Sequence, residues 1–510
     1  MRVAYVTPPP THMPPLTAPS HPVAEVAPRA TPWRPTATQL AIALTVLGGV
    51  LRFATLNVSS IELDESATLA LVHRGFSGML SHLSQSESTP PLYYIFVCAW
   101  TKVFGAGPIG FRSMSALIGT ITIPVMYLAG REISPRAGVW AAILTTLSPS
   151  MFFFSQQARA YGLLVLLSAA AFVAWERALR TPSTRHLALW SALSGLALLA
   201  HYFAAFLFIA EAVFLIVRLG WRRVVLPIGA VVIVGLALAP LAIHQRAEGK
   251  TNWIEQQSLP RRIVESMKIF TVGAYGPLVL FALALALLLV GCAIALVARR
   301  GTGAERNGAR DAAIVAAGAI VLPLLLAATH LVDVYDGRNM LAFFVPFAVL
   351  VAAGLGAARA PRAGAVLGGV LCAIYVTMIV AANAIPDYQR DNWRGVAHSL
   401  GRPTRSRLIV AEAFSAGPLS IYMGKLSDAA ASVPAVREVD FVALRHLRTV
   451  GPPQAAVVPR AAPAGFRLAG ITTTESFAIA RFVAASPVAP KASELAHLSG
   501  IGDIEPILQR

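Results

Sequence analysis

Charged side chains are scarce in this sequence of 510 residues: Asp, Glu, Lys and Arg make up 13% of the chain, whereas hydrophobic residues make up 56%. A chain of this composition cannot bury its apolar side chains in one soluble core, so most of it must face lipid or other helices within lipid. The composition therefore excludes an ordinary soluble protein and predicts an all-α polytopic membrane protein.

Cysteine and acidic residues are also few. The three cysteines, Cys98, Cys292 and Cys372, all lie in apolar stretches, which is typical of small packing residues and gives no disulfide framework. The deficit of acids leaves a net charge of +17, but Lys and Arg fall mainly between apolar runs, where orientation signals and contacts with anionic lipids belong. We therefore expect membrane lipids, and no nucleic acid, among the partners.

The apolar runs predict about 11 transmembrane helices, because about 20 apolar residues cross a hydrocarbon core of roughly 30 Å. The candidate spans are 40–56, 113–130, 137–154, 161–179, 187–200, 203–218, 224–243, 273–298, 311–330, 340–358 and 363–382. The stretch 187–219 is too long for one ordinary helix and short for two, and His201 at its centre favours a break. Residues 91–105 are too few to cross comfortably and predict a re-entrant or interfacial helix.

Five arginine clusters set the expected orientation. They lie two spans apart, so all five can share one face, which the positive-inside rule assigns to the cytoplasm. Arg29 and Arg34 place the N-terminus on the same side. We thus expect a multi-pass plasma-membrane protein in which residues 57–112 and everything after 383 lie outside the cytoplasm.

Three parts of the chain differ in composition. Residues 1–38 are rich in Pro, Thr and Ala and predict a disordered cytoplasmic tail. Residues 39–384 form the predicted transmembrane module, with juxtamembrane helices on its outer side. Residues 385–510 have Pro breaks and short alternating apolar patches such as "SRLIVAEAF" and "FRLAGITTT", which predict a small α/β or β-rich extracytoplasmic domain.

In this topology, unusual polar residues from separate segments converge at the outer face. They are Arg52; Asp64 and Glu65; Thr89, Tyr93 and Tyr94; Gln156, Gln157, Arg159 and Tyr161; His201 and Tyr202; and Asp333, Tyr335, Asp336, Arg338 and Asn339. Several have a purely structural alternative. An acidic pair can complement a helix N-terminus, tyrosines can form an interfacial belt, Arg52 can snorkel, and His201 can be an ordinary interfacial histidine.

Arg159 and Arg338 are harder to explain structurally, because they lie on the side that the positive-inside rule depletes of cations. A guanidinium there is suited to an anion such as phosphate, whose oxygens it binds bidentately. A carboxylate within hydrogen-bond reach of an acceptor hydroxyl can remove its proton. Together these groups suit transfer of a sugar from a lipid phosphate. The chain has no Gly-rich phosphate loop of either common type, and this chemistry needs none.

Several motifs resemble the GT-C class of integral-membrane glycosyltransferases, in the branch of the protein O-mannosyltransferases and the lipid A aminoarabinose transferases. They are "LDESATL" (63–69), "TPPLYYIF" (89–96), the stretch 111–164 with its "SQQARAY", "LLAHYFAAF" (198–206) and "DGRNMLAFFVP" (336–346). Each motif is weak alone, but their order and spacing are specific. They cover most of residues 40–350.

The resemblance implies roles for particular residues. It points to Asp64 as the catalytic base with Glu65 in support, to Arg52 beside the first outer loop, and to Arg159, Tyr161 and Arg338 as the holders of the lipid phosphate. Members commonly carry Lys or His where this chain has Thr89. An Arg-Tyr pair is often found where this chain has Arg338-Asn339.

The activity implied is inverting transfer of a sugar, mannose or arabinose among the candidates, from a polyprenyl-phosphate carrier to a glycan, lipid or protein outside the cytoplasm. Some GT-C enzymes use a divalent cation. Asp64, Glu65 and His201 are ligand types for one, although no spacing motif supports a site. The alternative readings are a polytopic transporter or lipid flippase, which ranks lower because the charges gather at one interface, and a non-catalytic scaffold.

Overall fold

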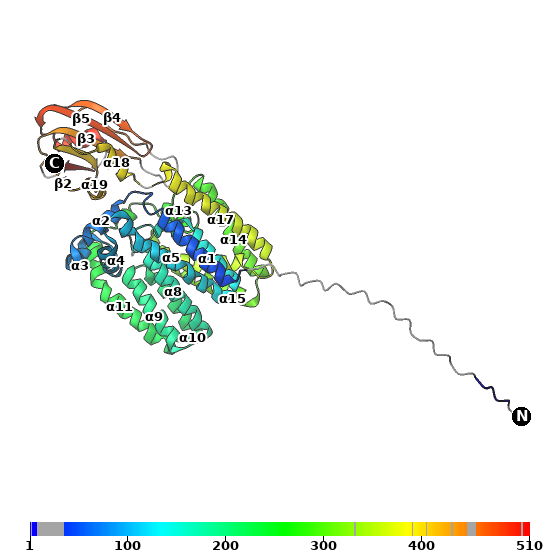
Figure 1. Ribbon diagram of the computed structural model, residues 1–510. Coiled ribbons are helices and arrows are strands. Elements are labelled where there is room, and N and C mark those ends of the chain that lie inside the picture. The colour runs from blue at the N-terminus through cyan, green and yellow to red at the C-terminus, as the bar shows by residue number, and fades with distance from the viewer. Residues whose placement is uncertain are drawn as a thin grey trace. The chain divides into compact units, whose positions relative to one another are not determined.

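The computed structural model describes residues 1, 3–7, 35–330, 333–389, 391–403, 405–429, 432–445, 455–500 and 503–509. The chain divides into two units, Met1–Thr36 and Ala37–Arg510. Most of the predicted tail 1–38 lies outside the described residues. The second unit contains a helical part followed by a sheet (Figure 1).

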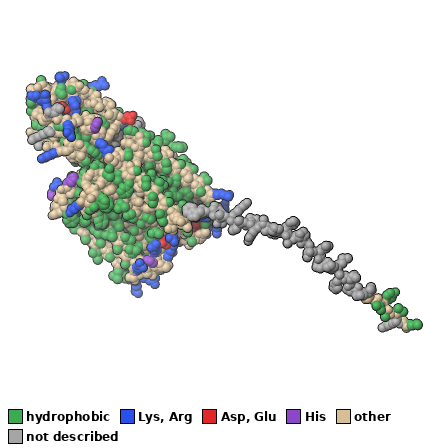
Figure 2. Space-filling view, viewed as in Figure 1, with side chains coloured by type: hydrophobic (Ala, Val, Ile, Leu, Met, Phe, Trp, Pro, Cys, Tyr) green, Lys and Arg blue, Asp and Glu red, His purple; other side chains and the backbone are tan. Residues whose placement is uncertain are grey.

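Helices occupy all eleven apolar runs. They are α1 (Ala37–Ala54), α5 (Pro108–Ile133), α6 (Pro135–Leu147) with α7 (Pro149–Phe154), α8 (Tyr161–Arg180), α9 (Thr184–Ala200), α10 (Ala204–Leu219), α11 (Trp221–Ala247), α14 (Val279–Arg300), α15 (Gly303–Ala328), α16 (Phe344–Leu355) and α17 (Pro361–Ala384). Among the described residues, seven helices are long and apolar enough to cross a membrane: α1, α5, α8, α11, α14, α15 and α17. Apolar side chains cover much of the visible helical surface, and Lys and Arg gather at the end formed by α9 and α10 (Figure 2).

Two apolar stretches of the sequence are interrupted for local reasons. The stretch 187–219 is two helices, because His201 adopts an extended conformation between α9 and α10. The run 137–154 is broken where Ser148 caps α7 by accepting a hydrogen bond from the Met151 amide, with Pro149 in the first turn. Proline is tolerated at that position because its missing N–H needs no partner there. All three cysteines are free.

Short helices lie between the long ones and carry most of the predicted site. They are α2 (Leu63–Val72), α3 (Gly75–Ser86), α4 (Leu92–Phe104), α12 (Asn252–Glu255), α13 (Leu259–Thr271) and the 3₁₀ helix η1 (Leu341–Phe343). The run 91–105 forms α4, a helix of 13 residues, which is shorter than a span requires. Its buried face, including Tyr93, Tyr94 and Cys98, packs against α2, α3, α5 and α9.

The C-terminal part is a mixed sheet with helices on both faces, which confirms a small C-terminal sheet domain and agrees with the α/β alternative of the predicted α/β or β-rich domain. Its elements are η2 (Pro386–Tyr388), α18 (Trp393–Leu400), β1 (Arg407–Glu412), α19 (Ala416–Met423), β2 (Ser427–Asp428), β3 (Val436–Leu444), β4 (Arg467–Thr473), β5 (Phe477–Val488), α20 (Ala492–Ser499) and β6 (Ile504–Gln509). The strand order is β2-β6-β1-β3-β5-β4, and among the described strands β1 and β3 pair in parallel whereas the other neighbours are antiparallel.

Side chains alternate across this sheet as a strand requires. Ile409 packs with residues of α18 and α19 on one face. Leu408 and Val410 pack with Leu495 of α20 on the other. The two apolar patches singled out in the sequence correspond to β1 and β4.

Candidate active site

Asp64 and Arg338 meet although 274 residues separate them in the sequence. The Arg338 Nη1 lies 3.1 Å from the Asp64 Oδ2. Asp64 stands in the first turn of α2, where a negative charge is favoured by the helix dipole. The two side chains are 37% and 33% exposed, so this ion pair is accessible from outside the protein.

Arg338 lies in the loop before η1 and is held by two further contacts. The Arg338 backbone N–H donates to the Asp336 Oδ1 at 3.1 Å, and the Arg338 guanidinium carbon lies 4.6 Å from the centre of the Trp253 ring of α12, a cation–π distance. Burial raises the pKa of Asp336 above its ordinary value, although the neighbouring Arg338 opposes the shift. Arg338 is thus positioned by Asp64, Asp336 and Trp253.

Helix α13 anchors the same loop. Arg262 pairs with both oxygens of Asp333, at 2.5 and 2.8 Å, and donates to the Tyr335 carbonyl at 3.0 Å. Gly337 lies so close to α13 that an added Cβ would be 2.9 Å from the Ser266 Cα. These contacts account for Asp333 and Tyr335 as supports of the loop.

Arg159 contacts the backbone of Asp64 from inside the protein and is nearly buried. Its Nη1 donates to both oxygens of Glu87, at 2.8 and 2.6 Å, to the Thr68 hydroxyl at 2.8 Å, and to the backbone carbonyl of Asp64 at 3.3 Å. Burial is the largest single influence and opposes the positive charge, but Glu87, Tyr94, Asp64 and Tyr161 together outweigh it and hold the pKa of Arg159 well above its ordinary value. Sequence reasoning missed Glu87; an isolated acid three residues before Pro-Pro is the signal that was available.

Glu65 occupies a very different environment from its neighbour Asp64. It is fully buried, and its Oε1 and Oε2 accept hydrogen bonds from Arg112 at 2.8 and 2.5 Å. The Ala158 and Glu62 backbone N–H groups also donate to it, at 2.9 and 3.3 Å. Arg112, on α5, was not among the predicted residues; its sign in the sequence is an arginine at the start of an apolar span. Glu65 therefore joins α2 to α5.

His201 and Tyr161 lie together at the end of α9 and the start of α8. Their ring centres are 5.6 Å apart. The His201 Nδ1 accepts from the Phe203 N–H at 3.4 Å, whereas its buried Nε2 has no hydrogen-bond partner within the described residues. Burial, with smaller contributions from Arg159 and Arg338, lowers the pKa of His201 to about 3. The imidazole is therefore neutral at pH 7.

The remaining predicted polar residues hold the short helices together. The Thr89 and Tyr94 hydroxyls are 2.7 Å apart, and those of Tyr93 and Ser115 are 3.3 Å apart. Tyr202 donates to the Gln245 Oε1 at 2.7 Å, and Gln245 in turn donates to the Thr89 carbonyl at 3.1 Å. The amide of Gln157 donates to the Glu62 carboxylate.

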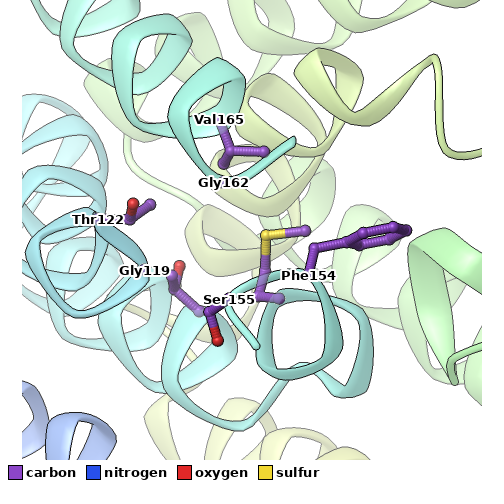
Figure 3. A pocket seen from close by; sticks show the side chains of 8 residues that line it. Gly119, Thr122, Phe154, Ser155, Gly162 and Val165 are labelled. Atoms are coloured by element: carbon purple, nitrogen blue, oxygen red, sulfur yellow. The ribbon is translucent and has the colours of Figure 1, made fainter. Parts of the chain in front are cut away.

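Arg52 is not brought to Asp64. It is buried in the helix bundle, where it donates to the Gly48 and Thr145 carbonyls at 3.0 Å each. Thr145 also lines a small cavity, and Figure 3 shows Thr122, Ser155 and Val165 around it. The cavity volume is about 10 Å³, which is the room that one water molecule needs. A sequence position near the end of a span gives the depth of a side chain but not its direction.

The described residues contain no group of three or more His, Cys, Asp or Glu side chains that could hold a metal ion. Asp64 contacts Arg338, Glu65 contacts Arg112, and His201 packs against Tyr161. The three suggested ligands thus point to different partners and do not fit a common cation.

Comparisons with known proteins agree with this architecture. Residues 88–244 match the sequence model of the dolichyl-phosphate-mannose-protein mannosyltransferase family. No curated protein has a sequence that matches the chain.

Several solved structures are similar to this chain at low sequence identity. The apo crystal structure of ArnT from Cupriavidus metallidurans is 11% identical with a TM-score of 0.51, over 76% of this chain and 84% of that one. The same protein bound to undecaprenyl phosphate is 15% identical with a TM-score of 0.49, over 71% and 69%. The Saccharomyces cerevisiae Pmt1-Pmt2 complex bound to its sugar donor is 17% identical with a TM-score of 0.30, over 41% and 32%.

The family match over residues 88–244 and the fold shared with ArnT support the resemblance of this chain to the GT-C class of integral-membrane glycosyltransferases. Within that class, the resemblance to the branch of the protein O-mannosyltransferases and the aminoarabinose transferases is confirmed.

The two adjacent acids differ in what their loss should do to the fold. Glu65→Ala leaves the buried Arg112 charge unpaired, which typically costs about 3–5 kcal/mol, so we expect a large loss of folded protein. Asp64→Asn alters an accessible pair and should change the free energy of unfolding by at most about 1 kcal/mol. Thermal unfolding in detergent measures both. Equal melting temperatures for the two variants would contradict the assigned roles.

Proposed function

We propose that the protein transfers a sugar from a polyprenyl-phosphate carrier to a hydroxyl acceptor, with Asp64 as the general base. The observation that carries this proposal is the accessible pair of Asp64 and Arg338, a carboxylate and a guanidinium within 3.1 Å of each other. The match to a family that is described by its dolichyl-phosphate-mannose donor supports the same donor class.

Arg338 is the group best placed to bind the donor phosphate. A guanidinium carries five N–H donors, so it has the capacity to hold phosphate oxygens while one Nη remains on Asp64. Positive charge at that point stabilises the phosphate as it leaves the sugar. Arg159 adds positive potential from inside the protein, but its Nη1 donates to Glu87. Its main contribution is therefore to fix the Asp64 backbone through the hydrogen bond to the Asp64 carbonyl.

Asp64 completes the reaction on the acceptor side. Its carboxylate takes the proton of the acceptor hydroxyl as that oxygen forms a bond to the anomeric carbon. The bond from the anomeric carbon to the phosphate oxygen breaks, and its electron pair stays on the phosphate beside Arg338. A single displacement of this kind inverts the anomeric configuration. Glu65 has a supporting role, because its bonds to Arg112 hold α2 in place.

The family description favours mannose, and arabinose is the second candidate. A glycan, lipid or protein hydroxyl at the membrane surface would serve as the acceptor. Tyr161 and His201, which lie beside the arginines, are the groups we propose to contact the donor.

Asp64→Asn should abolish sugar transfer, because an amide cannot accept the acceptor's proton. Binding of the donor should be retained, since Arg338 is unchanged. Transfer of radiolabelled sugar and retention of labelled donor on purified protein measure the two effects separately. Normal turnover by the Asn variant would refute the assignment of the base.

The site is proposed to face away from the cytoplasm, with the sheet on the same side and the N-terminus inside. In a background without the three native cysteines, a cysteine replacing exposed Thr472 on β4 should react with an impermeant maleimide in intact cells. A cysteine replacing exposed Thr181, between α8 and α9, should react only after permeabilisation. The reverse pattern would invert the orientation.

A further inference from the structure

The segment that leads into the catalytic acid is held by the C-terminal domain. Residues 55–62, here called the acid loop, connect α1 to α2. The Ile61 backbone N–H donates to the Tyr422 hydroxyl at 2.8 Å, across 361 residues of sequence. Tyr422 lies on α19, and α19 packs against α2 (Figure 1). The contact is close, because a Cβ added at Gly417 would lie 2.7 Å from the Ser66 hydroxyl oxygen.

Arg394 of α18 makes a second set of bonds to the acid loop. Its backbone N–H donates to the Ser60 hydroxyl at 3.1 Å. Its Nη1 and Nη2 donate to the Asn57 carbonyl and side-chain oxygens at 3.0 and 2.7 Å. The guanidinium also lies 5.7 Å from the centre of the Tyr422 ring, so the two side chains support each other.

The opposite side of the acid loop rests on a buried cation. Arg112 donates to the carbonyls of Leu56, Ser59 and Ser60 at 3.0, 2.8 and 2.7 Å. The loop is thus clamped between the helical part of the protein and the C-terminal domain. Three backbone carbonyls are fixed from the inside, whereas the Ile61 amide and the Asn57 and Ser60 side chains are fixed from the C-terminal domain.

We infer that Tyr422 and Arg394 are positioning residues for Asp64, so that the C-terminal domain is a working part of the active site. The inference rests on the proposed function. Asp64 is three residues beyond Ile61, and a shift of about 1 Å in a positioning element can cost about 100-fold in rate. The Arg394 bonds to Asn57 are exposed, and exposed polar contacts add little to stability. Their loss should therefore affect turnover more than folding.

Tyr422→Phe removes the hydroxyl and keeps the ring, and Arg394→Ala removes the guanidinium. Each should lower kcat about tenfold, a partial displacement on the scale above, with the KM for the donor unchanged because neither residue contacts Arg338. The double variant should lose little more than either single one, since both act on one loop. Arg394→Lys should recover part of the loss by restoring one donor to Asn57.

Arg445→Ala is the matched control. Arg445 is an arginine of the same domain whose Nη1 donates to the Glu475 carbonyl at 2.9 Å, within that domain. This variant should keep both kcat and KM. A kcat for Tyr422→Phe and Arg394→Ala equal to that of the Arg445 control would overturn the inference.

Amide hydrogen exchange of the peptide covering 55–66 supplies a readout that needs no turnover. In detergent without substrate, exchange should be faster in Tyr422→Phe than in the wild type and unchanged in Arg445→Ala. If the wild type transfers no sugar from any donor, the proposed function fails. Hydrogen exchange alone then tests whether Tyr422 holds the acid loop. Unchanged exchange in Tyr422→Phe would in that case refute it.

Discussion

The buried ion pair between Glu65 and Arg112 fixes the geometry on which the site depends. It ties the first turn of α2 to α5, and the same arginine holds three carbonyls of the acid loop. With α2 fixed in this way, the carboxylate directly before Glu65 in the chain, that of Asp64, is partly exposed. Two adjacent acids thus have different environments, because Glu65 is neutralised inside the protein and Asp64 is accessible, as the proposed general base must be.

The arrangement of cations follows the same division. Arg159 is nearly buried, and its Nη1 donates to Glu87, Thr68 and the Asp64 backbone carbonyl. Arg338 is partly exposed, lies over Trp253 and reaches Asp64 with its side chain. A buried, paired guanidinium fixes structure, whereas an accessible one is available for a phosphate. Non-helical backbone near the membrane is stable in these loops because protein groups satisfy its carbonyls and amides.

Much of the fold could be predicted from the sequence, because long apolar runs specify helices wherever they occur. Local sequence patterns also predicted the helix break at His201 and the apolar patches that form strands β1 and β4. The break at Pro149, the order of the strands and the partners of each buried charge were not, since they depend on contacts between distant segments. Arg52 illustrates the limit: its depth was predictable, but its side chain turns to carbonyls of α1 and α6. Arg112 and Glu87, which fix the site, carry no motif of their own.

Donor consumption shows whether Arg338 holds the phosphate of a polyprenyl-phosphate sugar. Purified wild-type protein and Arg338→Ala would be incubated in detergent with radiolabelled polyprenyl-phosphate sugars of several kinds, and the released polyprenyl phosphate would be quantified. The wild type should consume one class of donor, and Arg338→Ala should consume far less of it. Equal consumption by both proteins, or none of any donor by folded wild type, would contradict this role of Arg338.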